Sequence, residues 1–242
     1  MRLTRVYVEA ALAAGSPFVI DGSAANHIMR VLRLRDGDLL TLFDGRGGEY
    51  GARITSFRKD SVQVEVQEHR DVERESALDL TLAQGISRGE RMDWVMQKAT
   101  ELGVTRIIPV ITERTMVKLD ERQAAKKLDH WRGIVASACE QCGRNRVPEV
   151  TLPVAYYDVL TRIDPTVTRV LLSPTGTLRA SDLPRPSRVA MLIGPEGGLS
   201  EKEQEAAVSA GFQPLRMGPR ILRTETAAIA ALAALQHDFG DI

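Results

Sequence analysis

From about residue 75 onward, short apolar runs alternate with longer stretches in which apolar residues recur at helical spacing. The runs "LDLTLAQGI", "RIIPVI", "RVLLSP" and "RVAMLIGP" are typical of strands that are buried on both faces. Between and after them come helical patterns such as "GERMDWVMQKATELGV" and "TETAAIAALAALQHDFG". Parallel strands need a crossover connection, usually a helix, so this alternation predicts an α/β domain built on a mostly parallel sheet.

The first part of the chain has the pattern of a small β domain. "DLLTLFDGRGGEYGARITSF" predicts two strands joined by a glycine-rich turn, and "SVQVEVQEH" alternates as a half-buried strand does. One short helix is expected at "SAANHIMRVLRL", with Ser23 as its N-cap. Several short strands with such turns are typical of a small barrel. Because the charged stretch "EHRDVERESA" suits a linker, we expect domains at residues 1–72 and 73–242.

The overall charge gives no general argument for binding nucleic acid. Lys and Arg together number 32, as do Asp and Glu, so any such site must depend on local patches. No apolar run approaches the roughly 18 residues that span a bilayer. The N-terminal apolar stretch is short and contains Glu9, which is not typical of a signal peptide, so we expect a cytoplasmic protein.

Cys139 and Cys142 are spaced as C-x-x-C, a spacing found in redox pairs and in halves of zinc sites. A structural zinc site needs four ligands, and the sequence has no second cysteine pair. A redox pair belongs at a helix N-terminus, whereas these cysteines lie toward the end of a long helical pattern that Gly143 closes. We therefore interpret them as helix-packing residues and expect no metal.

Two glycine-proline loops carry the strongest functional signal, and the first is "GPEGG" at residues 194–198. It follows an apolar strand and precedes a helix whose Ser200 and Glu203 have the spacing of a capping box. Such a turn often holds a phosphate, but the lysine of a P-loop is missing and Glu196 would repel a polyphosphate. Glu196 suits a cationic or hydroxyl-bearing ligand better, and a turn chosen only for its backbone geometry stays open.

The second loop, "GPRILRTET" at residues 218–226, also joins a predicted strand to a helix. Loops after neighbouring parallel strands meet at the C-terminal edge of a sheet, where α/β proteins bind ligands. A third strand ends at Leu172-Ser173-Pro174, on the same edge. We expect the three segments to face one pocket.

Five segments together resemble one known family. "ANHIMRVLRLRDGD", "GISRGERMDWVMQKATELGV", "ACEQCGRNRVPEV", "LIGPEGGLSEKE" and "MGPRILRTETAAIAAL" occur in this order across both predicted domains. In them the chain resembles the bacterial 16S ribosomal RNA uridine-N3 methyltransferases of the SPOUT class. "RILRTETA" is the most specific of the matching segments, and residues 150–185 match least.

This resemblance implies a fold and a reaction. The fold class is α/β, with an N-terminal PUA-like β-barrel that helps to bind RNA and a C-terminal α/β domain that contains a trefoil knot. The reaction is methylation of N3 of a specific uridine in 16S ribosomal RNA of the small ribosomal subunit, with S-adenosylmethionine as cofactor. The resemblance also implies a homodimer. The cofactor-binding residues that the resemblance implies are Leu172, Ser173, Gly194, Glu196, Gly197, Met217, Gly218, Leu222 and Thr226.

Attack by uridine N3 requires that its proton be removed or the resulting anion be stabilised. Arg223 is our candidate for stabilising negative charge on the uracil carbonyl oxygens. Glu225 and Glu140 are the candidates for the general base, although a carboxylate in the first turn of a helix is also favoured electrostatically. The arginines that we expect to bind RNA phosphates, with solvated ion pairs as the alternative, are Arg30, Arg33, Arg35, Arg88, Arg91, Arg144 and Arg146.

Two other functions stay open at this point. One is a non-catalytic RNA-binding protein that kept the fold and lost the chemistry, against which the intact "GPEGG" and "RILRTETA" loops argue. The other is an enzyme that uses the glycine-rich turn to bind a nucleotide phosphate. The missing lysine and the carboxylate of Glu196 argue against it.

Overall fold

A computed structural model of the protein describes residues 4–117 and 119–242. The chain divides into two compact units. Unit 1 contains the residues up to Glu75 together with Cys139–Val147, and unit 2 contains Ser76–Ala138 and Pro148–Ile242. The division therefore falls near the predicted linker, but a short later segment packs with the first unit.

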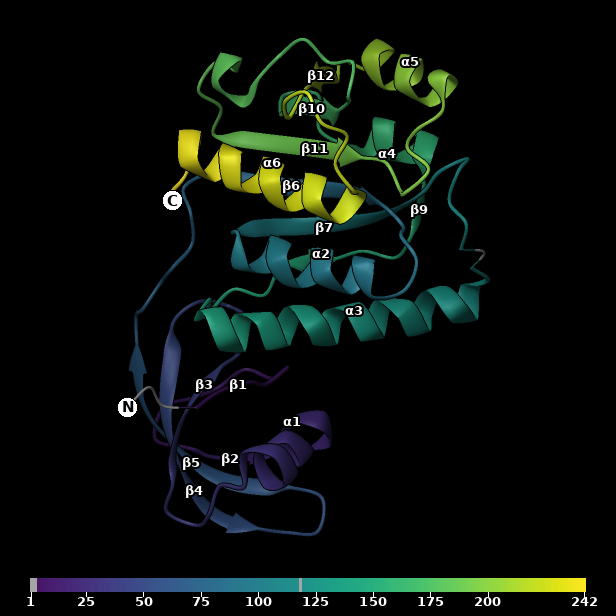
Figure 1. The fold of residues 1–242 in the computed structure, drawn as a ribbon. Coiled ribbons are helices and arrows are strands. Elements are labelled where there is room, and N and C mark those ends of the chain that lie inside the picture. Colours follow the sequence, from purple (N-terminus) through teal and green to yellow (C-terminus); the bar gives the residue numbers. More distant parts are fainter. Residues whose placement is uncertain (1–3, 118) are drawn as a thin grey trace. The chain divides into compact units, whose positions relative to one another are not determined.

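Unit 1 is built on a five-stranded sheet with the order β1-β3-β4-β5-β2. Its elements (Figure 1) are β1 (Arg5–Tyr7), β2 (Pro17–Ile20), α1 (Gly22–Asn26), the π-helix η1 (His27–Leu32), β3 (Leu39–Phe43), β4 (Glu49–Phe57) and β5 (Val62–Arg70). The β3–β4 and β4–β5 pairs are antiparallel, as the strand and turn patterns indicate. Among the described residues the pairing runs from β1 to β2 without closing. Where a barrel was predicted, the described residues therefore form an open sheet, whose edge strands β1 and β2 are short and do not pair with each other.

The predicted helix at "SAANHIMRVLRL" changes type along its length. The short α-helix α1 passes directly into the π-helix η1, which ends at Arg33 in the left-handed region with a φ of 53°. The residue that precedes the first helical turn is Asp21, so the prediction of Ser23 as N-cap is wrong. The helix begins at Gly22, which places Ser23 inside its first turn.

Buried polar contacts hold the segment Cys139–Val147 in unit 1. Arg5 donates to the Arg144 carbonyl at 3.1 Å and to Asn145 Oδ1 at 2.6 Å, and it forms an ion pair with Glu49. Arg144 is 4% exposed and its Nε donates to Glu75 at 3.0 Å. Because buried charges are stable only when they are paired, these contacts fix the segment within the unit.

Unit 2 contains the other sheet, which has seven strands in the order β12-β10-β11-β6-β7-β8, with β9 paired to β7. Its strands are β6 (Asp79–Gly85), β7 (Val104–Ile111), β8 (Glu149–Val150), β9 (Val154–Ala155), β10 (Thr168–Leu172), β11 (Arg188–Ile193) and β12 (Gln213–Leu215). The helical elements are α2 (Glu90–Glu101), α3 (Glu121–Cys142, whose last turn belongs to unit 1), α4 (Tyr156–Arg162), the 3-10 helix η2 (Ala180–Asp182), α5 (Glu201–Ser209) and α6 (Thr224–Phe239). All pairings recorded in this sheet are parallel, which confirms the α/β prediction.

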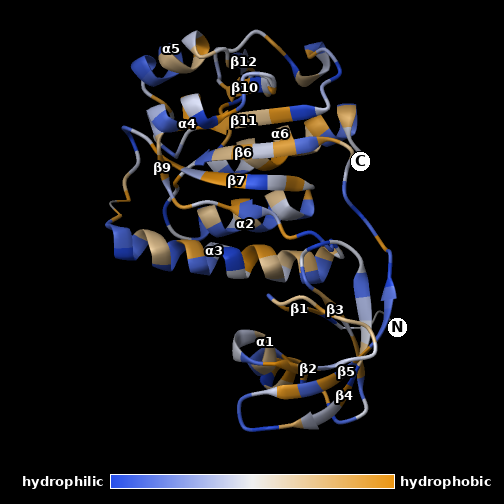
Figure 2. Ribbon diagram, turned by 180° about the vertical axis from the view of Figure 1, so that it is seen from behind, coloured by the Kyte–Doolittle hydropathy of each residue, from blue (hydrophilic) through white to orange (hydrophobic). Residues whose placement is uncertain are grey.

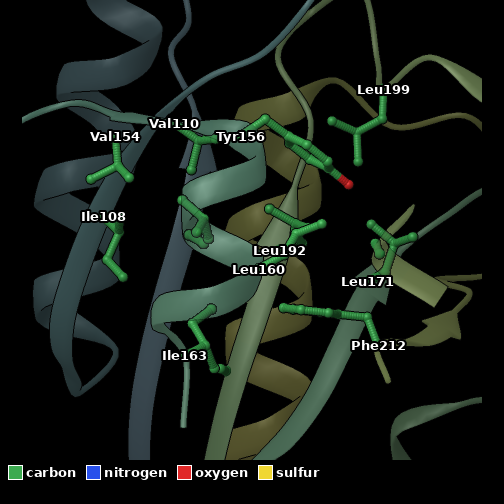
Figure 3. Close-up of a cluster of buried hydrophobic side chains, with 14 residues drawn as sticks. Ile108, Val110, Val154, Tyr156, Leu160, Ile163, Leu171, Leu192, Leu199 and Phe212 are labelled. Carbon is green, nitrogen blue, oxygen red and sulfur yellow. The ribbon is translucent and has the colours of Figure 1, made fainter. Parts of the chain in front are cut away.

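Helices cover both faces of this sheet. Helices α4 and α5 pack on one face, where Leu171 and Leu192 of the strands lie on the same side as Tyr156 and Leu160 (Figure 3). Helices α2 and α6 contact each other, and they also contact β7 and β11 respectively. The central strands are accordingly coloured as largely hydrophobic in Figure 2. Burial on both faces explains why they read as continuous apolar runs.

The ends of two helices match their sequence patterns. Ser200 accepts a hydrogen bond from the N–H of Glu203, and the Glu203 carboxylate accepts one from Ser200, which confirms the capping box. The cysteines lie in the last turn of α3, where burial raises the pKa of Cys139 to about 12. A reactive redox thiol needs a lowered pKa.

Within residues 4–117 and 119–242, no helix combines the length and apolarity needed to cross a bilayer.

Candidate active site

A cavity of about 640 Å³ opens in unit 2 where β10, β11 and β12 end. The three strands are adjacent and parallel, so their carboxyl ends lie on one edge of the sheet. The cavity is lined by Leu172–Pro174, by Ile193–Leu199 and by residues of the loop between β12 and α6. The three segments therefore face one pocket, as the sequence predicts, and its volume suits a nucleoside-sized ligand.

The cavity brings together most of the residues that were predicted to bind the cofactor. Those that line it are Leu172, Ser173, Gly194, Glu196, Gly197, Met217, Gly218 and Leu222. Thr226 is exposed on α6 and is not among the lining residues. The wall thus combines aliphatic side chains with backbone that glycine leaves accessible, an arrangement that suits a flat apolar ring with polar edges.

The "GPEGG" loop is packed closely against the end of the neighbouring strand β6. A Cβ atom at Gly85 would lie 2.4 Å from the backbone nitrogen of Pro195. A Cβ atom at Gly194 would lie 2.9 Å from the backbone nitrogen of Leu199. Both glycines are required by close backbone approach, which a side chain would prevent.

The carboxylate of Glu196 is fixed by the residues that begin α2. Its Oε1 accepts hydrogen bonds from the backbone N–H of Arg88 at 2.8 Å and from Arg91 Nη1 at 2.9 Å. Burial acts to raise the pKa of Glu196, but these hydrogen bonds and the Arg91 charge hold it below its ordinary value. Glu196 therefore stays ionised at neutral pH and ties its loop to α2.

The loop after β7 anchors the other side of the same turn. Arg114 donates to the Gly197 carbonyl at 2.9 Å, and the Glu113 N–H donates to Glu203 Oε1 at 2.8 Å. Arg114 also lines the cavity, and it was not predicted from the sequence. The signal that could have found it is its place in a loop that follows a parallel strand, at the edge where the other loops meet.

Two of the predicted catalytic residues lie at the cavity. Glu225 is 7% exposed in the first turn of α6, and its Oε1 lies 3.9 Å from Arg91 Nε. Its other carboxylate oxygen is buried and has no hydrogen-bond partner among the described residues. Arg223 is exposed, precedes α6 and also lines the cavity. The cavity thus has a carboxylate that can accept a proton and a cation that can stabilise negative charge.

The third catalytic candidate, Glu140, lies in unit 1. Its carboxylate accepts a hydrogen bond from the Tyr7 N–H at 3.0 Å. Burial raises the pKa of Glu140, and the Tyr7 bond acts in the opposite direction. Within unit 1, Glu140 joins the last turn of α3 to β1.

The arginines predicted to bind RNA differ in how available they are. Arg30, Arg33 and Arg35 are exposed around the end of η1, and Arg88 and Arg91 are exposed at the start of α2. Arg146 is exposed but its Nε lies 2.6 Å from a Glu73 carboxylate oxygen. Arg144 is buried and paired with Glu75, so within unit 1 a phosphate could reach it only by breaking that pair. These roles remain predictions.

Two further polar residues were not predicted from the sequence: Thr224, which lines the cavity, and Gln84, which contacts Thr224. Gln84 is fully buried at the end of β6, and its Nε2 donates to Thr224 Oγ1 at 2.9 Å. Thr224 Oγ1 in turn donates to the Gly194 carbonyl at 2.7 Å. The sequence signal that could have revealed this contact is a glutamine inside the apolar run "LDLTLAQGI".

In the part of the chain described, no group of three or more His, Cys, Asp and Glu side chains could share a metal ion.

Comparison with known protein families gives two matches. The model of the RNA methyltransferase domain matches residues 74–236, and that of the RNA methyltransferase PUA domain matches residues 20–67. The first includes the cavity and the second includes most of the unit 1 sheet.

Individual relatives match along the whole chain. Ribosomal RNA small subunit methyltransferase E of Buchnera aphidicola subsp. Schizaphis graminum is 36% identical over 100% of this chain and 98% of its own length. The protein of the same name from Bacillus subtilis is 35% identical, over 98% of this chain and 94% of its own. A crystal structure of this methyltransferase from Neisseria gonorrhoeae, bound to S-adenosyl methionine, has a TM-score of 0.93 at 41% identity and full coverage of both chains. A Legionella pneumophila protein in complex with the same cofactor has a TM-score of 0.97 at 43% identity, again with full coverage of both.

Proposed function

Because this chain belongs to the RNA methyltransferase family, and has ribosomal RNA small subunit methyltransferases E among its full-length relatives, we propose that it methylates N3 of a uridine in 16S ribosomal RNA, with S-adenosylmethionine as the methyl donor. The observation that carries the proposal is the cavity formed by the ends of β10, β11 and β12. Two similar chains, at 41% and 43% identity, were solved with this cofactor bound.

The lining of the cavity suits the parts of this cofactor. Leu172, Met217 and Leu222 offer aliphatic surfaces for the two faces of an adenine ring, and Gly194 and Gly218 leave backbone groups accessible to its edge. Glu196 would act by holding the "GPEGG" loop through Arg88 and Arg91. Thr226 has the weakest support among the proposed residues because it does not line the cavity.

Arg223 and Glu225 are the residues that would act on the uracil base. S-adenosylmethionine supplies an electrophilic methyl group on a cationic sulfur. The N3 proton passes to the Glu225 carboxylate, the N3 electron pair forms the bond to the methyl carbon, and the carbon–sulfur bond electrons remain on sulfur. Arg223 stabilises the charge that builds up on the uracil oxygens. Glu140 lies in unit 1, and we keep it as the second candidate for the base.

RNA contacts would come from both units. Arg30, Arg33 and Arg35 form an exposed basic group in unit 1, within the matched PUA region. Arg88 and Arg91 lie where α2 begins, and Arg91 lines the cavity. Such residues bind phosphates and set the register of an RNA without reading its sequence. The substrate in this proposal is the small ribosomal subunit, so the protein would act in the cytoplasm.

We also propose a homodimer that forms through α2 and α6. These helices pack beside each other on one face of the sheet. Trp94 on α2 is 58% exposed, and α6 has a half-buried apolar surface at Ile229, Ala230 and Ala233. Exposed aromatic and apolar surface on neighbouring helices is typical of the core of an interface, and a second copy would cover both helices.

A trefoil knot is the finer topology that we propose for unit 2. The segment after β12 runs close beside the segment after β10. The Arg216 N–H donates to the Leu178 carbonyl at 2.8 Å, and a Cβ atom at Gly176 would lie 2.7 Å from the Pro214 carbonyl oxygen. This close passage supports the threading of the C-terminal segment past the β10 loop.

A methylation assay tests the proposed function. Small ribosomal subunits from a strain that lacks this modification are incubated with the protein and S-adenosylmethionine carrying a labelled methyl group, and the 16S RNA is digested to nucleosides for mass spectrometry. We expect labelled 3-methyluridine. Label in a different nucleoside would contradict the proposed position. Absence of label, with RNA binding retained, would favour the non-catalytic RNA-binding alternative.

A further inference from the structure

A buried chain of hydrogen bonds connects the two loops that face the cavity. The side-chain amide of Gln84 donates to Thr224 Oγ1 at 2.9 Å, and the Thr224 hydroxyl donates to the Gly194 carbonyl at 2.7 Å. Gly194 begins the "GPEGG" loop, whereas Thr224 is the first residue of α6 and ends the second loop. The hydroxyl of Thr224 is therefore the group that joins one loop to the other.

The direction of this chain is fixed by the groups around it. Gln84 Nε2 also lies within reach of the carbonyl oxygens of Gly85 at 3.1 Å and Gly194 at 3.4 Å, so its amide nitrogen faces acceptors. With Gln84 donating, the Thr224 hydroxyl proton is free to point at Gly194. A hydroxyl accepts and donates at once, and hydrogen bonds in such a chain strengthen one another in a low-dielectric interior.

Burial makes the connection rigid. Gln84 is 0% exposed and Thr224 is 7% exposed, so water does not replace a lost partner readily. Gln84 sits on β6, a strand with neighbours on both sides, opposite Ile193 of β11. Thr224 also lines the cavity, and Gly194 forms part of the same wall. A shift of either loop would leave a buried polar group without its partner.

We infer that Gln84 and Thr224 are positioning residues for cofactor binding, and that they hold the Gly194 loop and the Met217–Leu222 loop at the spacing that S-adenosylmethionine requires. This inference rests on the proposed function. It assigns no chemical step to either side chain. Preorganisation of this kind improves affinity because the loops do not have to be ordered when the ligand binds.

Calorimetric titration with S-adenosylmethionine tests the inference on Thr224→Val and Thr224→Ser. Valine keeps the shape of threonine and removes the hydroxyl, whereas serine keeps the hydroxyl. We expect Thr224→Val to weaken binding roughly tenfold, as the loss of one buried hydrogen bond predicts, and Thr224→Ser to restore most of the affinity. The matched control is Thr161→Val on α4, whose hydroxyl makes an exposed bond to the Asp158 carbonyl.

Two further measurements separate positioning from loss of folding. In steady-state methylation, Thr224→Val should raise KM for S-adenosylmethionine and leave KM for ribosomal subunits unchanged. Gln84→Met removes the amide, and its effect on affinity should not add to that of Thr224→Val, because both break one chain. Equal affinity of wild type and Thr224→Val, or fully additive effects, would overturn the inference. Failure of the wild type to bind the cofactor would instead overturn the proposed function.

Discussion

Arg91 Nη1 lies 2.9 Å from Glu196 Oε1, and this ion pair joins the first turn of α2 to the "GPEGG" loop. Glu196 was expected from the sequence to repel polyphosphates and to suit a cationic or hydroxyl-bearing ligand. It accepts from the Arg88 amide as well. The loop is therefore held by residues at the start of α2, and its acidic residue has a structural partner whether or not it also contacts a ligand.

Glu196→Gln should weaken this attachment. Both side chains are partly exposed, so we expect a loss of about 0.5–1 kcal/mol in the free energy of unfolding at pH 7. The folded pKa of Glu196 lies below the ordinary 4.5, so this stabilisation is fully present above about pH 4.5 and is lost as the pH falls through the folded value. Urea unfolding of both proteins across that range measures the difference.

The control for this variant is Glu205→Gln, an exposed position on α5. A difference between wild type and Glu196→Gln that stays constant down to the lowest pH at which the protein folds would contradict the assigned role of the carboxylate.

Gly85→Ala should disturb the cavity without touching its ligand. The added methyl group would lie 2.4 Å from the Pro195 nitrogen, so the "GPEGG" loop has to move. We expect a lower Tm together with weaker binding of S-adenosylmethionine. Gly133→Ala is the matched control, because it lies in α3 with nothing within 4 Å of the new methyl group, and it should stabilise by about 0.5–1 kcal/mol. A Gly85→Ala protein with wild-type affinity and Tm would show that the close approach does not matter.

Much of this architecture follows from local sequence patterns. Alternating strands and helices predict a parallel sheet, and the rule that its carboxyl ends meet at one edge places Leu172, Gly194 and Gly218 at one cavity. The resemblance to a methyltransferase family with a PUA domain is confirmed by both family models. The bond from Gln84 to Thr224 could not be predicted, because the two residues are 140 positions apart and their contact depends on tertiary packing.

The open sheet of unit 1 is a second feature that could not be predicted from the sequence. Short strands and glycine turns indicate a barrel, but closure depends on pairing between the two edge strands, which no local pattern encodes. The buried pairing of Arg144 with Glu75 was likewise hidden, because an arginine after a helix suggests a surface residue. Both features depend on tertiary packing, and Arg144 and Glu75 are 69 positions apart in the sequence.

Glu225→Gln should separate chemistry from binding. The amide keeps the size of the side chain and cannot accept the N3 proton, so we expect kcat to fall by about 10² or more while the Kd for S-adenosylmethionine stays within about twofold. Single-turnover methylation of ribosomal subunits measures the first quantity, and calorimetry measures the second. Glu201→Gln, in the exposed first turn of α5, is the control. Undiminished kcat in Glu225→Gln would leave Glu225 with only its electrostatic role at the start of α6.

Trp94→Asp should dissociate the proposed homodimer. Burying an unpaired charge in the middle of an apolar interface is unfavourable by more free energy than the surrounding contacts contribute. We therefore expect a monomer in analytical ultracentrifugation. Val208→Asp is the control, because it changes a side chain that is 49% exposed on α5, on the opposite face of the sheet. An unchanged oligomer in Trp94→Asp would place the interface elsewhere.

Binding of S-adenosylmethionine at the ends of β10, β11 and β12 is the central claim, and calorimetric titration tests it most directly. The wild type should bind saturably with one cofactor per chain. Leu222→Trp, which places a larger side chain in the cavity wall, should weaken binding at least about tenfold without a large change in Tm. Leu152→Trp, at a side chain that is 52% exposed and does not line the cavity, should bind as the wild type does. Equal binding by Leu222→Trp, or no binding by the folded wild type even with small ribosomal subunits present, would contradict the account.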